Sequence, residues 1–128
     1  MKPKFDFHDI ISILTSNEII SKIDIRNVDE IKGKAVYRIR CNLIPSRYKF
    51  EMRLIQMEEE ILYSYQVFTD KPIVRWDNAP HYQKIKTYPH HFHSKDGNVI
   101  ESLLKGNITE DLEKVLSTIK EALTEHEY

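Results

Sequence analysis

The sequence has little cysteine and little glycine: one cysteine, Cys41, and three glycines in 128 residues. A single cysteine cannot form an internal disulfide, and small secreted domains usually carry several. So few glycines argue against a barrel or sandwich with many tight turns. No apolar run reaches the length of a membrane span, and the first residues lack the apolar segment of a signal peptide. We therefore expect a cytoplasmic protein without a membrane partner.

Net charge is also nearly absent, since the formal value is −1 although 30% of the residues are charged. The charges are unevenly placed: residues 32–53 hold seven basic side chains against one acid, whereas residues 109–127 hold six acids against two lysines. A basic central segment in a near-neutral chain can bind a polyanion on one surface. The alternative is that these charges are solvated on one face of a sheet. Length and ordinary apolar content predict a single domain over residues 1–128.

Helical periodicity occurs at the two ends of the chain. Residues 7–14 place apolar side chains at i, i+3, i+4 and i+7, with Asp6 as the expected N-cap and Asp9 in the first turn. Near the C-terminus a second stripe of this kind follows Asn107 and Thr109, either of which can cap the helix. The stripe is formed by Leu112, Val115, Leu116, Ile119 and Leu123.

Between the helices, apolar and polar side chains alternate with the period of β-strands. The alternating segments are residues 19–26, 34–44, 48–54, 61–67 and 73–77. Short turns between them predict an antiparallel meander of about five to six strands. With both terminal helices on its apolar face, the domain is expected to be a two-layer α+β fold. Arg38, Arg40, Lys49 and Arg53 then face outward, while Cys41 lies in the core.

Chemistry-bearing side chains are concentrated in residues 75–93. This segment holds four of the six histidines, namely His81, His90, His91 and His93. Pro80 and Pro89 disfavour helix at the residues before them, so the chain should leave the sheet as an ordered loop and return in extended form. Loops on a rigid scaffold are common places for function. Three interpretations of this segment remain open.

The first interpretation is a site for a divalent metal such as zinc. In an extended run, His91 and His93 face the same side, roughly 7 Å apart along the backbone. Two imidazoles can converge on one ion, with His81 or Asp77 completing the site. The sequence contains no CxxC or HExxH pattern. The metal ligands expected on this interpretation are His81, His91 and His93.

The second interpretation is acid–base catalysis without a metal. Cleavage of RNA through its own 2′-hydroxyl needs a base, an acid and a cation near the phosphate. Two histidines with Arg75 or Lys86 supply these groups, and Asp77 can orient one imidazole. The third interpretation is structural, because histidines and tyrosines often satisfy hydrogen bonds beneath a long loop.

The same segment resembles a known family. The runs Tyr63-Ser-Tyr-Gln, Arg75-Trp-Asp-Asn-Ala-Pro-His and Thr87-Tyr-Pro-His-His-Phe-His are similar to those of TumE-type toxins, small prokaryotic proteins formerly catalogued as a domain of unknown function. The resemblance covers roughly residues 18–103. The family pattern usually has a second histidine where Tyr82 stands and a lysine where Phe92 stands.

The resemblance implies the toxin of a two-gene toxin–antitoxin pair, with a helix-turn-helix antitoxin as partner and RNA as a plausible substrate. The positions carried over from the family are Arg75, Asp77, Asn78, His81, His90, His91 and His93. Together with the outward bases, this predicts two groups of residues. The catalytic candidates are Arg75, Asp77, His81, His91 and His93; the binding candidates are Arg38, Arg40, Asn78, Lys86 and His90. The alternative function is a non-catalytic protein whose histidine-rich loop holds a structural metal or a protein partner.

Overall fold

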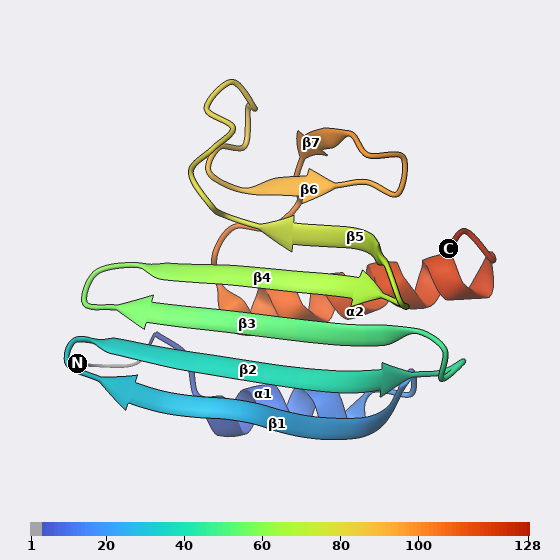
Figure 1. The fold of residues 1–128 in the computed structure, drawn as a ribbon, viewed down its shortest axis with the longest axis horizontal. Helices are drawn as coiled ribbons and strands as arrows, with labels where there is room; N and C mark the ends of the chain where they lie inside the picture. Colours follow the sequence, from blue (N-terminus) through green and yellow to red (C-terminus); the bar gives the residue numbers. More distant parts are fainter. Residues whose placement is uncertain (1–3) are drawn as a thin grey trace.

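The computed structural model describes residues 4–128, in which seven strands lie between two helices. The helices are α1 (Phe7–Ser16) and α2 (Ile108–Thr124). The strands are β1 (Ile20–Ile31), β2 (Lys34–Leu43), β3 (Lys49–Met57), β4 (Ile61–Phe68), β5 (Pro72–Asp77), β6 (His91–His93) and β7 (Val99–Glu101). All seven strands form one antiparallel sheet in sequence order (Figure 1).

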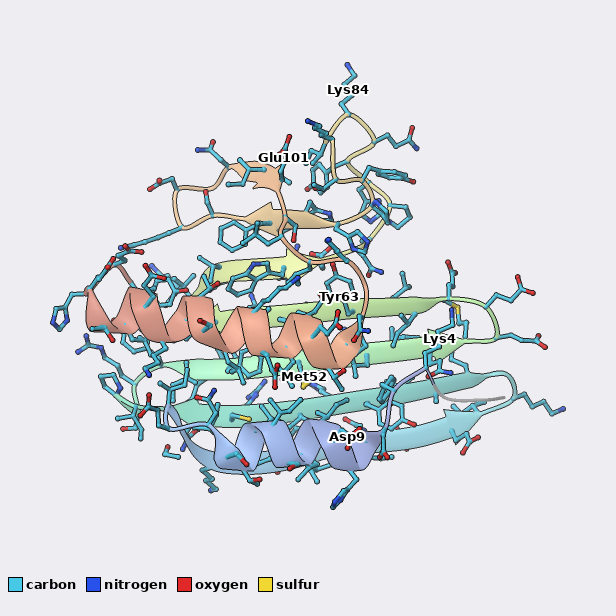
Figure 2. All side chains as sticks on the ribbon, turned by 180° about the vertical axis from the view of Figure 1, so that it is seen from behind. Lys4, Asp9, Met52, Tyr63, Lys84 and Glu101 are labelled. Atoms are coloured by element: carbon cyan, nitrogen blue, oxygen red, sulfur yellow. The ribbon has the colours of Figure 1, made fainter. Side chains whose placement is uncertain are left out.

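Both helices cover the same face of the sheet, α1 over the strands near the N-terminus and α2 over the middle of the sheet (Figures 1 and 2). The core between the two layers is apolar because alternate residues of each strand point toward the helices. In β3 and β4, for example, Phe50, Met52, Leu54, Tyr65 and Val67 are almost completely buried. Neither helix of residues 4–128 covers the opposite face of the sheet, which holds outward charged side chains such as Arg38, Arg40 and Glu51.

The α+β meander predicted from periodicity is confirmed. Asp6 caps α1 by accepting a hydrogen bond from the backbone N–H of His8, and Asn107, rather than Thr109, caps α2. Cys41 is buried in the core, as expected. The structure adds the strands β6 and β7, each of only three residues, a length at which alternation is not recognisable. Among residues 4–128, neither helix combines the length and apolarity needed to span a bilayer.

On the open face, the strand register places residues of the long strands and of the short strand β6 in one cross-strand row. Arg38 of β2 lies opposite Arg53 of β3, and Arg53 lies opposite Ser64 of β4. The same cross-strand row continues through Asp77 of β5 to His91 of β6. Because directly opposed residues share one face of a sheet, this row runs from the basic strands into the histidine-rich segment.

Candidate functional site

Four polar side chains meet on the open face at the ends of β5 and β6. The register pairs Arg75 with His93 and Asp77 with His91, so all four side chains project to the same side. Between them Trp76 and Phe92 face the helices, with ring centroids 4.8 Å apart. This aromatic pair therefore anchors both strands from below.

The carboxylate of Asp77 is the centre of the cluster. One oxygen, Oδ1, lies 2.8 Å from His91 Nε2 and accepts a hydrogen bond from the Ala79 backbone N–H at 3.0 Å. The other oxygen, Oδ2, accepts a hydrogen bond from Arg75 Nε at 2.8 Å and lies 3.3 Å from His93 Nε2. Asp77 is buried, so its charge is compensated by these neighbours rather than by water.

The imidazole of His91 is almost completely buried and held from both sides. Its Nδ1 donates to the backbone carbonyl of Pro89 at 3.0 Å, since a carbonyl oxygen can only accept. Its Nε2 is close to Asp77 Oδ1, but the angles do not fit a hydrogen bond, and this nitrogen has no hydrogen-bond partner among the described residues. His91 Nε2 is thus a buried polar atom without a donor or acceptor aligned to it.

His93 is more accessible and borders the guanidinium of Arg75. Arg75 Nη2 lies 3.1 Å from His93 Nε2, and arginine can only donate, so this nitrogen of His93 is the acceptor. Burial lowers the pKa of His93 below 6.5, and the nearby positive charge of Arg75 lowers it further, while Asp77 opposes the shift. His93 is therefore neutral near pH 7, with the lone pair of Nε2 directed into the cluster.

A pocket of about 320 Å³ opens over these groups. Arg53, Ser64, His81 and Tyr82 line it beside the cluster. The ring of Tyr82 covers the two imidazoles, with its centroid 4.7 Å from that of His91 and 5.8 Å from that of His93. The pocket thus combines an aromatic wall, two cationic side chains and a buried carboxylate.

Three side chains of the pocket can offer ligand atoms to one metal ion. Asp77, His91 and His93 have ligand atoms within 4.8 Å of one another. His81 lines the same pocket but does not belong to this group. Of the two residues named from the sequence as completing a metal site, Asp77 lies with His91 and His93.

The remaining residues predicted for the site lie in different surroundings. The side chain of Asn78 accepts from the backbone N–H of Tyr63 and donates to the carbonyl of Ile61, which fastens the start of β4. His90 Nδ1 is 2.7 Å from the Tyr63 hydroxyl, and its ring stacks on that tyrosine, which belongs to the core. Lys86 is exposed in the loop and does not line the pocket. Asn78 lines the pocket beside Asp77, although its side chain is engaged by the backbone, whereas His90 and Lys86 do not line the pocket.

The two basic residues predicted on β2 share one carboxylate. Glu51 Oε1 lies 3.1 Å from Arg38 Nε and 2.9 Å from Arg40 Nη2. Arg40 also places its guanidinium over the ring of Phe68. Arg53, by contrast, forms no ion pair within the part of the chain that the structure describes, and it borders the pocket.

Arg53 and Tyr82 are pocket residues that the sequence did not assign to the site. Alternation along residues 48–54 placed Arg53 on the outward face, but only the register shows which residues it lies beside. Tyr82 stands where the family pattern has a histidine, and nothing local in the sequence indicates that its ring covers His91. The alternation of the sequence could have indicated Arg53 as a site residue. The position of Tyr82 depends on the path of the loop, which only the structure shows.

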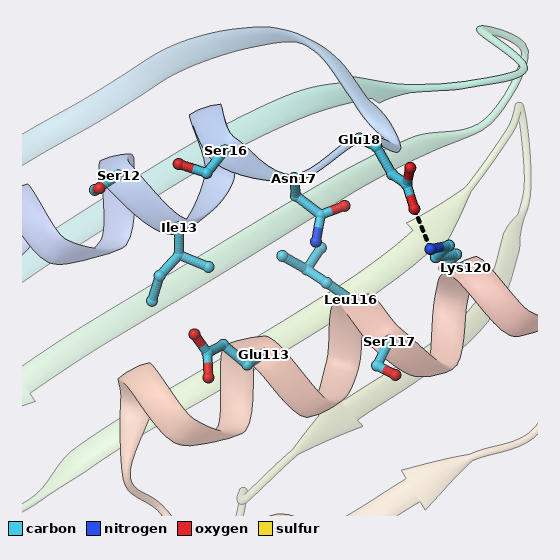
Figure 3. Close-up of a pocket in the computed structure, with 9 residues that line it drawn as sticks. All are labelled: Ser12, Ile13, Ser16, Asn17, Glu18, Glu113, Leu116, Ser117 and Lys120. Carbon is cyan, nitrogen blue, oxygen red and sulfur yellow. Dashed lines mark ion pairs between the residues drawn. The ribbon is translucent and has the colours of Figure 1, made fainter.

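A larger hollow, of about 710 Å³, lies on the other side of the molecule between α1 and α2 (Figure 3). Serines and Asn17 line much of it, and an ion pair between Glu18 and Lys120 crosses one end. Its lining contains no histidine and no cluster that could hold a metal. The smaller pocket over β5 and β6 is therefore the candidate functional site.

Comparison with known proteins supports one family. No curated protein and no solved structure matched the chain. The family model described as Toxin TumE matches residues 10–125, a range that includes every strand, all of α2 and residues 10–16 of α1. The chain therefore belongs to the TumE family of toxins, the toxin components of toxin–antitoxin pairs, which implies an antitoxin as its partner.

Proposed function

We propose that this toxin cleaves RNA in the pocket over β5 and β6. The observation that carries the proposal is the convergence of Arg75, Asp77, His91 and His93 beside an open pocket. A guanidinium, a carboxylate and two imidazoles are the groups that phosphodiester cleavage uses for charge stabilisation and proton transfer. Strongly interacting polar groups of this kind, partly withdrawn from water, are typical of functional sites.

The open face beside the pocket supports a polyanionic substrate. Arg38 and Arg53 lie directly opposite each other on neighbouring strands. Like charges in such positions repel, and Glu51 compensates Arg38 but not Arg53. A phosphate group between the two guanidiniums removes the repulsion, because each guanidinium can donate two hydrogen bonds to it. An RNA strand in the pocket would thus continue toward β2.

The proposed roles follow from position and exposure. Arg75 contacts the phosphate, because its side chain is 43% exposed while Nε is fixed by Asp77. His93 has a lone pair at Nε2, with which it can take part in proton transfer. His91 is too deeply buried to contact RNA and borders Asp77 instead. Exposed His81 is placed on the pocket wall, where it can donate a proton to the leaving oxygen. Tyr82 offers a ring on which a base can stack.

The experiment is cleavage of end-labelled RNA by purified protein, with and without chelator, beside His93→Gln and the control His8→Gln. His8 is an exposed residue of α1, on the helix-covered side of the sheet, so its replacement changes a histidine without touching the pocket. We expect cleavage by the wild type and by His8→Gln and its loss in His93→Gln. Intact RNA with high concentrations of folded wild-type protein would refute the proposal and favour a non-catalytic binding role for the loop.

The proposal includes the setting in which the protein acts. A toxin that cleaves RNA acts in the cytoplasm, and its antitoxin must prevent access of RNA to the pocket or to Arg53. We propose a helix-turn-helix protein as this antitoxin, on the basis of the family resemblance. A neighbouring gene encoding such a protein, whose product binds the chain and stops RNA cleavage, is the expected finding.

A further inference from the structure

We propose that Asp77, His91 and His93 hold one divalent transition-metal ion of the zinc type. This site lies in the same pocket as the proposed RNA cleavage and deepens it, but binding of the ion can be measured without RNA. The proposal differs from the ligand set expected from the sequence, because Asp77 takes the place of His81.

The hydrogen bond at Pro89 determines which nitrogen of His91 is free. Nδ1 carries a proton and donates it to the Pro89 carbonyl, so in the neutral ring Nε2 has a lone pair. That lone pair is buried, lies 2.8 Å from a carboxylate oxygen and has no aligned hydrogen-bond donor among residues 4–128. Metal-binding histidines commonly donate their second ring nitrogen to a backbone carbonyl in this way.

The hydrogen bond at Arg75 leads to the same conclusion for His93. Because Arg75 donates to His93 Nε2, this nitrogen carries a lone pair rather than a proton, and a metal ion would replace the Arg75 N–H as its partner. With both rings neutral, neither His91 Nε2 nor His93 Nε2 carries a proton, and both lie beside the carboxylate of Asp77. Arg75 supplies one positive charge to Asp77 and His93, but none of the described residues donates a hydrogen bond to His91 Nε2. A cation beside this nitrogen and Asp77 Oδ1 would therefore stabilise the cluster further.

Each imidazole nitrogen lies near one oxygen of Asp77, at a separation close to that between ligand atoms of a tetrahedral site. Zinc bonds to imidazole nitrogen and carboxylate oxygen of about 2.0–2.1 Å place neighbouring ligand atoms roughly 3.3 Å apart. In the structure Asp77 Oδ2 and His93 Nε2 are 3.3 Å apart, and Asp77 Oδ1 and His91 Nε2 are 2.8 Å apart. All the ligand atoms lie within 4.8 Å of one another. Binding therefore requires these side chains to adjust until one oxygen of Asp77 and both imidazole nitrogens contact the same ion.

The ligand types decide which ions the site prefers. Two imidazoles with one carboxylate suit zinc, cobalt and manganese, whereas magnesium and calcium prefer sites made wholly of oxygen. Three protein ligands leave a position open, as in catalytic rather than structural zinc sites. This position faces the pocket, where it can take a water molecule or a phosphate oxygen of the substrate, and the ion would stabilise charge there.

The neighbouring guanidinium weakens the affinity without blocking the site. Arg75 donates to Oδ2 of Asp77 and to His93 Nε2, so its Nη2 must release His93 when the ion binds. The other contacts of Oδ1 are the Ala79 N–H and the nearby His91 Nε2. A cation beside Arg75 experiences repulsion, so we expect an affinity below that of a structural zinc site. The ion and the Arg75 guanidinium would together bind an anion such as a phosphate more strongly than either positive charge does alone.

The test is calorimetric titration of untagged, chelator-dialysed protein with Zn²⁺, Co²⁺ and Mg²⁺ in separate experiments. We expect one equivalent of zinc or cobalt to bind, a visible absorption band from the cobalt complex, an increase in Tm with zinc, and no saturable binding of magnesium. Absence of saturable zinc and cobalt binding to the folded wild type would overturn the proposal.

Three variants identify the ligands. His93→Gln removes one ligand at a position with a 23% exposed side chain. We expect at least about 100-fold weaker zinc binding, because loss of only the hydrogen-bonding partner of a metal ligand already lowers metal affinity by about 10–100-fold. His91→Gln serves as a second ligand variant. His81→Gln removes a histidine of the same pocket outside the ligand set and should bind zinc like the wild type. Equal binding by His93→Gln, or a large loss in His81→Gln, would refute the ligand assignment.

Binding and cleavage can fail separately. Zinc binding with uncut RNA would leave the metal site in place and remove the proposed ribonuclease activity. RNA cleavage that persists in chelator, by protein that binds no zinc, would keep the activity and overturn the metal site.

Discussion

The two faces of β5 and β6 show how the same backbone serves packing on one side and chemistry on the other. Toward the helices, Val74, Trp76 and Phe92 pack into or against the apolar core. Toward the open side, the residues between them form the Asp77 cluster. The core face derives its stability from area removed from water, whereas the polar groups of the open face are fixed by one another.

One face of β5 and β6 therefore stabilises the fold, and the other carries the functional groups. A polar cluster close to an open pocket contributes little to folding, because desolvation offsets much of the attraction between its charges. Its geometry must therefore be imposed by the strands that carry it, and these are held by the aromatic pair below. Substitutions on the two faces should consequently have different effects. Those on the helix-facing side reduce stability, and those on the open side reduce activity.

The largest effect is expected from Trp76→Ala. Removing this buried ring should lower the free energy of unfolding by about 3–5 kcal/mol, because apolar burial is lost and a cavity remains. Urea denaturation measures the change. The matched control is Tyr82→Ala, which removes a 38% exposed ring on the open side and should cost about 1 kcal/mol or less. Similar losses for both rings would break the comparison.

The second effect concerns the open face alone. His93→Gln should reduce RNA cleavage by about 10²–10⁴-fold, because it removes a nitrogen that either takes part in proton transfer or holds the ion that stabilises charge. Its free energy of unfolding should change by less than about 1 kcal/mol, since the side chain is partly exposed. Kinetics and denaturation on the same preparation test both parts. A stability loss as large as that of Trp76→Ala would show that the cluster holds the fold together.

The third effect tests the path of RNA across the open face. Arg53→Ala should weaken RNA binding and reduce the slope of log K against log salt by about 0.7, the value for one phosphate contact with a single strand. Arg47→Ala removes the same charge from the turn between β2 and β3, at the opposite end of the sheet from Asp77, and should leave the slope unchanged. Titrations with labelled RNA at several salt concentrations distinguish the two. Equal slopes for Arg53→Ala and the wild type would exclude this path.

The smallest effect belongs to the core face. Burial raises the pKa of Cys41 from 9.0 to about 12, so above pH 9 the unfolded chain loses this proton while the folded chain keeps it. Stability is therefore lost as pH rises, by less than about 1 kcal/mol at pH 9.5 from this group. Urea denaturation at pH 8 and 9.5 should show a smaller decrease for Cys41→Ala than for the wild type. An identical decrease in both proteins would contradict the burial of this thiol.

Much of the fold and part of the site could be predicted from local pattern. Alternation in β2 to β5 assigns each side chain to a face, and the same parity separates His90 from His91 and His93. It also placed Arg75 and Asp77 together on the polar face. Local pattern did not show that Asn78 would be engaged with the backbone of β4, because that contact joins residues distant in sequence.

The sequence by itself determined the elements and their faces, because periodicities of about two and 3.6 residues are properties of neighbouring positions along the chain. Only the tertiary structure decided that Asp77 lies opposite His91 and Arg75 opposite His93. The loop of residues 78–90 connects these strands, and a loop of that length permits several registers. The register is selected by packing of Trp76 on Phe92 and by the hydrogen bonds of the loop, and a shift by one residue would have turned both histidines toward the core.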